Sequence, residues 1–244
     1  MHRFMLLTAL FALGCRPLPR TPFVRAVADD DAESVARFLG DGEPVDQRES
    51  RGLTPLMWAA RTDSVRSMAV LIDAGADVNA RDTSNRWTPL MHAVHTQSAG
   101  AVKLLLERGA SPNAVEYDGQ LVPLLMAAGN ADAAIVRLLL QHGANARYKG
   151  EWGETPLALA VSGGALTDLT DHPILGGCHP ETVRAILEAD PAIRLEDNTA
   201  TRRAHFFAKF HGCVDAISLI GDDHSPKPRD ARQAGSATAS RSQP

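Results

Sequence analysis

Two stretches of the sequence decide the fold: residues 54–82, TPLMWAARTDSVRSMAVLIDAGADVNARD, and residues 88–116, TPLMHAVHTQSAGAVKLLLERGASPNAVE. Both begin with Thr-Pro, carry an alanine five residues after the threonine, and end in a Gly-containing turn followed by asparagine. The proline recurs at spacings of 33, 34, 34 and 33 residues, at Pro22, Pro55, Pro89, Pro123 and Pro156. A fixed period of this length predicts a repeat protein in which each unit packs on its neighbours.

One unit is expected to contain two short helices and a loop. Thr54 is a predicted side-chain N-cap, and Pro55 then occupies the first helical position, where its missing N–H is not needed. A second helix follows with apolar residues at helical spacing, and Gly75 ends it in the left-handed conformation. Residues 77–82 run out as an extended polar loop, which we call a finger. Because one unit cannot bury its apolar face alone, the units are expected to stack.

These markers resemble the ankyrin repeat, whose signature runs Thr-Pro-Leu-His, Ala-Ala, Leu-Leu, Gly-Ala and Asn. The resemblance covers about residues 21–220 and implies an all-α solenoid of five to six helix-turn-helix repeats with short hairpin fingers. It also implies a protein that binds other proteins and has no enzymatic activity. The motif histidine ties the finger to the helix in that family, and its absence here predicts less rigid fingers. Its place is taken by Val24, Met57, Met91, Leu125 and Ala158.

The chain is expected to divide into four parts. Residues 1–14 read as an export signal, with an apolar run over residues 4–13 and small residues at positions −3 and −1 before Cys15. The same cysteine suits a bacterial lipobox, although the residues at −3 and −2 are exchanged relative to its commonest form. Lipidation of Cys15, ordinary cleavage, a cytosolic protein and a first helix packed on the core therefore stay open. The remaining parts are a tether at 15–20, a repeat domain at 21–221 with an insertion within 162–180, and a disordered tail at 222–244.

Composition excludes several classes of function. A hydrophobic content of 44% and a net charge of −4 are typical of a globular protein and argue against a dedicated nucleic-acid binder. No apolar stretch reaches the roughly 18–20 residues that a bilayer-spanning helix needs, so membrane contact is expected only through a lipid at Cys15. No cofactor and no metal site are expected, since His92 and His95 lack a third ligand. A monomer is expected.

The cysteines of the C-terminal half allow two interpretations. In the insertion, His172, Cys178 and His179 would be the residues of an enzyme or metal protein, although a flexible loop is a poor frame for catalysis. A disulfide between Cys178 and Cys213 is the favoured alternative, because export places both thiols in an oxidising compartment. Two buried free thiols are the remaining possibility.

The large aromatic residues give the strongest functional signal. None of the three tryptophans and two tyrosines occupies a core position of a second helix: four fall in fingers, and Trp58 shares a register with His92 just before the repeat alanine. Tryptophan, tyrosine and arginine are the residue types that anchor interfaces, and the resemblance implies that fingers and first helices line the concave face used for partners. The alternative is that the rings pack between adjacent fingers. The predicted binding residues are Trp58, Trp87, His92, Tyr117, Tyr148, Trp152, Arg81 and Arg86.

The sequence therefore predicts a non-enzymatic protein-binding module that is exported. We expect a lipoprotein on the periplasmic side of a bacterial membrane, or a soluble periplasmic or secreted protein. The protein partner is of unknown identity. An immunity protein against a delivered toxin, an accessory protein for a periplasmic antioxidant enzyme and a secreted effector are the roles that remain open.

Overall fold

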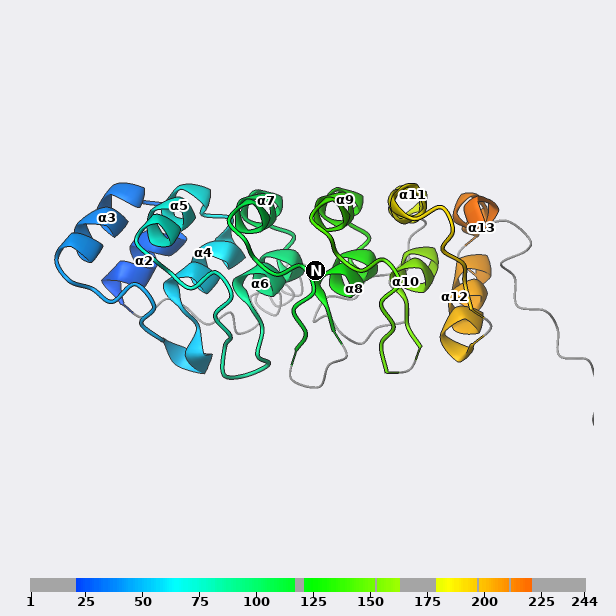
Figure 1. The fold of residues 1–244 in the computed structure, drawn as a ribbon, viewed down its shortest axis with the longest axis horizontal. Coiled ribbons are helices and arrows are strands. Elements are labelled where there is room, and N and C mark those ends of the chain that lie inside the picture. Colours follow the sequence, from blue (N-terminus) through cyan, green and yellow to red (C-terminus); the bar gives the residue numbers. More distant parts are fainter. Residues whose placement is uncertain are drawn as a thin grey trace, which may run out of the picture.

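The computed structural model describes residues 21–116, 121–151, 153–162, 179–196, 198–210 and 212–220. Within these ranges the chain forms six helix pairs that stand side by side in a single row (Figure 1). The expected all-α repeat architecture is confirmed. Residues 1–20, Tyr117, Trp152, most of the insertion with Cys178, and the tail lie outside the described residues. The pairs are α2 (Pro22–Ala28) and α3 (Ala32–Gly40), α4 (Pro55–Thr62) and α5 (Val65–Asp73), α6 (Pro89–His95) and α7 (Ala99–Glu107), α8 (Pro123–Gly129) and α9 (Ala133–Gln141), α10 (Pro156–Ser162) and α11 (Pro180–Ala189), and α12 (Thr199–Phe210) and α13 (Val214–Ile220).

The residues that define the repeat start and end these helices as predicted. The hydroxyl of Thr54 accepts a hydrogen bond from the N–H of Met57, and Thr88 caps α6 in the same way. Val122 has no side-chain acceptor, and α8 begins without a side-chain cap. Gly75 follows the second helix at φ 92°, a left-handed conformation that a residue with a Cβ rarely adopts.

The core lies between the two layers of helices. First helices such as α4 and α8 are buried on nearly every side, whereas second helices such as α5 bury one stripe, including Met68 and Leu71. The repeat alanines of α4, α6, α8 and α10 are at most 1% exposed, so their small side chains let neighbouring first helices approach closely. These alanines are Ala59, Ala93, Ala127 and Ala160.

Fingers join each second helix to the next first helix, and they extend from one edge of the row (Figure 1). We call residues 41–54 finger A, 74–88 finger B, 108–122 finger C and 142–155 finger D. Finger A contains the short 3-10 helix η1 (Ser50–Gly52). The fingers are the part of each repeat that projects beyond the packed helices.

Asparagines near the root of the fingers link each repeat to the next. The amide oxygen of Asn113 accepts from the N–H of Asn145 at 2.9 Å, and its amide nitrogen donates to the carbonyl of Gly143 at 2.9 Å. Asn79 makes the same pair of bonds to Ser111 and Gly109. The repeating asparagine is therefore a connector between successive turns.

Replacing Asn113 with alanine should lower the free energy of unfolding by about 1–2 kcal/mol, because two hydrogen bonds between repeats are lost. Urea unfolding of the purified chain measures the change. Asn85→Ala is the matched control, since the Asn85 side chain is exposed at the tip of finger B. Equal stability of the two variants would show that the connector carries no net stability.

Cys213 lies at the turn between α12 and α13, where it is 2% exposed. Its N–H donates to the carbonyl of Ala208 at 2.8 Å, which fixes the turn. Cys178 is outside the described residues, so its pairing with Cys213 stays a prediction.

Candidate functional site

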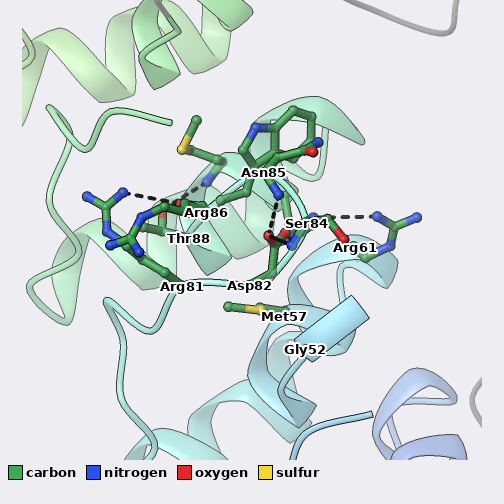
Figure 2. Close-up of polar contacts among 12 residues, drawn as sticks. Gly52, Met57, Arg61, Arg81, Asp82, Ser84, Asn85, Arg86 and Thr88 are labelled. Atoms are coloured by element: carbon green, nitrogen blue, oxygen red, sulfur yellow. Dashed lines mark hydrogen bonds and ion pairs between the residues drawn. The ribbon is translucent and has the colours of Figure 1, made fainter. Parts of the chain in front are cut away.

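Finger B is shaped by a single carboxylate. The N–H of Asp82 donates to the carbonyl of Trp87 at 3.0 Å, which closes a hairpin. One carboxylate oxygen of Asp82 then accepts from the N–H groups of Ser84 and Asn85 at 3.0 and 2.9 Å (Figure 2). Aspartate favours such turns because its short side chain reaches the backbone two and three residues ahead. The turn at the tip of finger B is therefore stabilised by a side chain of the finger itself.

The second oxygen of Asp82 ties the finger to the helices. It lies 2.9 Å from Nε2 of His92 on α6, and Nδ1 of the same ring lies 3.4 Å from a guanidinium nitrogen of Arg61 on α4. Arginine only donates, so Nδ1 is the acceptor, and Nε2 carries the hydrogen that it donates to Asp82. The two partners thus fix one tautomer of His92. Both Asp82 and His92 have side chains that are only 4% exposed.

The charges of this pair follow from its surroundings. Burial alone would raise the pKa of Asp82, but the hydrogen bonds from His92 and from the N–H groups of Asn85 and Ser84 outweigh it and hold the pKa below its ordinary value. Burial lowers the pKa of His92, and the attraction of Asp82 does not restore it. At neutral pH the site therefore contains a carboxylate beside a neutral imidazole.

Trp87 packs inside this site. Its ring centroid lies 5.4 Å from that of His92 and 5.1 Å from that of His95, and its Nε1 donates to a carboxylate oxygen of Glu116 on finger C at 3.2 Å. Trp87 is 8% exposed. The ring therefore connects finger B, helix α6 and finger C.

Residues 23–116, which include this site, match a protein-family model described as ankyrin repeats in three copies. Residues 23–116 are therefore ankyrin repeats. A search of curated proteins finds no match to the sequence. Ankyrin repeats are in general protein–protein interaction modules, so a protein partner of unknown identity is implied.

The expectation that Trp58, Trp87 and His92 lie exposed on the partner-facing surface is wrong. They are 4%, 8% and 4% exposed, respectively. Trp87 is covered because the unit that follows it, residues 88–116, supplies the two histidine rings and Glu116 around it. Trp58 and His92 occupy a register that is buried in four consecutive first helices, since Met126 and Leu159 hold the same position and are 3% and 1% exposed. The rings of Trp58 and Trp87 are therefore part of the packing.

The other predicted binding residues are placed differently. Arg86 is exposed at the tip of finger B, and Arg81 is half-buried. Tyr148 is half-buried against the core, and burial followed by the charge of Glu116 raises its pKa. Tyr117 and Trp152 lie outside the described residues, and their role stays a prediction.

Asp82 is the central residue of the site, although the sequence placed it only within the extended polar loop of residues 77–82. Its signal was the run Asp-Thr-Ser-Asn, which favours a side-chain-stabilised turn. The missing motif histidine predicts less rigid fingers. In the structure His92, one residue after the motif position, ties finger B to α6.

Acidification should destabilise the chain through His92. The ordinary pKa of histidine is 6.5, and burial lowers it in the folded chain. Below pH 6.5 the unfolded chain therefore binds a proton that the folded chain does not, and stability falls by at most about 1.4 kcal/mol per pH unit for this one group. His92→Met, which copies Met126 at the same register, should flatten the decline between about pH 7.5 and 5.5 in urea unfolding.

The exposed Asn85 provides the control, and Asn85→Ala should keep the wild-type slope. His205, whose pKa burial also lowers, contributes equally to both variants. A wild-type slope in His92→Met would contradict the assignment of His92 as the acid-sensitive group.

The described residues contain no group of three His, Cys, Asp or Glu side chains placed to hold a metal ion. The residues of the catalytic alternative, His172 and Cys178, are outside the described ranges, whereas His179 directly precedes α11. Among the described helices, none combines the length and the apolar character that crossing a bilayer requires.

Proposed function

We propose that this ankyrin-repeat chain is a non-enzymatic binding module of the bacterial cell envelope that takes its protein partner on its fingers. One observation carries the proposal: the turns of finger B are fixed by buried Asp82, while the tip residues Thr83, Ser84, Asn85 and Arg86 stay exposed. A surface that is ordered before binding loses little conformational entropy when a partner docks.

The packing of the tryptophan rings also supports recognition by the finger tips. Trp58 and Trp87 stabilise the stack from inside, which leaves recognition to the polar and charged tips. Polar rims with arginine are common at protein interfaces, whereas bulk hydrophobicity does not distinguish them. The proposed contact surface is therefore the tips of the fingers, with the first-helix residues beside them.

A photocrosslinking amino acid placed at position 85 tests the proposal in cells. It sits at the tip of finger B, and the matched position is 103, on the outer helix α7, where the Lys103 side chain is 64% exposed. We expect a crosslinked protein from position 85 and none from position 103. Crosslinks from position 103 alone, or equally from both, would place the partner elsewhere. The identity of the crosslinked protein, a toxin or an enzyme, separates the immunity role from the accessory role.

The envelope location rests on residues 1–14 and Cys15 of the sequence. Growth with labelled palmitate followed by fractionation tests it. We propose that the wild-type chain carries label in the membrane fraction and that Cys15→Ser does not. Label-free protein in the periplasm or the medium would favour ordinary cleavage, and protein in the cytosol would contradict export.

A further inference from the structure

We propose that the tips of fingers A and B form a carboxylate-binding surface, and that the partner presents an acidic segment of protein to it. The inference rests on the proposed function and specifies the chemistry of the partner. Four arginines make up the surface: Arg48, Arg51, Arg81 and Arg86. The two tips are in direct contact, because the N–H of Thr83 donates to the carbonyl of Arg51 at 3.0 Å.

The tips present positive charge to solvent. Arg48, Arg51 and Arg86 are exposed. Of the acidic residues at the tips, Asp82 is buried and bonded to His92, and Glu49 is half-buried and accepts from the N–H of Thr21 at 2.9 Å. The carboxylates of Asp82 and Glu49 are therefore directed away from solvent, while the guanidinium groups remain at the surface.

Two of the arginines are held in place by backbone carbonyl groups. Nη1 of Arg48 donates to the carbonyls of Gly52 and Arg81 at 2.9 and 2.8 Å, which joins finger A to finger B. Nη1 of Arg81 donates to the carbonyl of Arg86 at 3.3 Å and to that of Val115 on finger C. Within the described chain these bonds use one nitrogen of each group, so further N–H donors remain for a carboxylate, which guanidinium groups bind in pairs of hydrogen bonds.

Arg86 occupies a position that favours glycine. It has φ 59°, in the left-handed region, and lies three residues before Pro89. The same register is glycine in the other described fingers that show it, at Gly52 with φ 71° and Gly153 with φ 82°. Arg51 is also left-handed, at φ 62°. Strained backbone at bulky residues is typical of sites where the side chain has a function, so binding explains why arginine stands where glycine fits better.

The surface suits a protein carboxylate better than a nucleic acid. The whole chain carries a net charge of −4, and Asp46 and Asp77 lie at the roots of the same two fingers. A nucleic acid is a dense polyanion, so these carboxylates would repel it. A short acidic segment of protein can contact the arginines without approaching the carboxylates.

Binding of a defined peptide to the full chain tests the inference. The probe is a fluorescent peptide of alternating Glu and Ser, compared with its Gln–Ser counterpart at low salt. We expect the Glu peptide to bind and salt to weaken the complex. Arg86→Gly should lower the affinity at least about fivefold, the effect of losing one such contact, with a melting temperature equal to or above that of the wild type. Lys103→Ala on α7 should change neither.

In the binding experiment, three results would overturn the inference: equal binding of the Gln peptide, full affinity in both Arg86→Gly and Arg51→Gly, or tighter binding of a DNA oligonucleotide than of the Glu peptide. The position-85 crosslink separates this inference from the proposed function. If the segment crosslinked at position 85 is basic or apolar, the acidic partner is contradicted, but binding on the fingers still stands. If the segment is acidic, it supports both the proposed function and this inference. Crosslinks from position 103 alone remove both.

Discussion

Replacing Trp87 with alanine should lower the free energy of unfolding by about 3–4 kcal/mol, the usual cost of truncating a buried tryptophan. The ring is 8% exposed, contacts His92 and His95, and donates to Glu116. Its removal leaves a cavity where finger B, α6 and finger C meet. Urea unfolding monitored by far-UV circular dichroism measures the loss.

Val214→Ala is the control for this prediction, because Val214 is 70% exposed and its truncation should change stability by less than about 0.5 kcal/mol. Partner capture by Trp87→Ala should be unchanged under conditions where the variant remains folded. A variant with wild-type stability and weakened capture would instead show that Trp87 is a binding anchor, as the sequence alone suggested.

Replacing Asp82 with alanine should lower the free energy of unfolding by about 2–3 kcal/mol. The change removes a charged acceptor from the buried Nε2 of His92 and from the N–H groups of Ser84 and Asn85, and hydrogen bonds to charged groups contribute about 1.5–3 kcal/mol. Amide hydrogen exchange at residues 83–86 should accelerate, because the turn loses its acceptor.

Asp73→Ala is the matched control, since Asp73 at the end of α5 is an exposed carboxylate that pairs at 2.6 Å with Arg108, the residue after α7. Exposed pairs contribute about 0–1 kcal/mol. Asp82→Asn separates the two functions of Asp82: its amide oxygen can still accept from the turn, but its amide nitrogen cannot accept from His92. Asp82 variants as stable as Asp73→Ala would contradict a fastening role for the buried carboxylate.

The ends of the helices could be predicted from the sequence because they depend on local chemistry. Thr54 and Pro55 start a helix through contacts within three residues, and Gly75 ends one through its own backbone freedom. These effects require no knowledge of neighbouring repeats, so a single unit is sufficient to predict them.

The burial of the aromatic rings could not be predicted in the same way. Trp87 is covered by His95, eight residues away, and by Glu116, 29 residues away. Its position in a finger suggests exposure. The ring is nevertheless buried, because the groups that cover it come from the next turn of the solenoid. The His92–Asp82 contact joins residues ten apart on different elements, and no helical or strand spacing predicts it.

Arg86 shows what the comparison of repeats adds. The sequence placed it among the interface residues because of its type, whereas the structure gives a separate reason: an exposed arginine in a left-handed position that is glycine in fingers A and D. The residue type does not reveal this left-handed backbone conformation, so the sequence could not predict it.

The most direct test of the central claim is amide hydrogen exchange of the chain with and without its captured partner. If the partner docks on the fingers, exchange at residues 83–86 becomes slower on binding, and exchange in the outer helices α5 and α7 is unchanged. Protection confined to α5 and α7, with none at the tip of finger B, would contradict docking on the fingers.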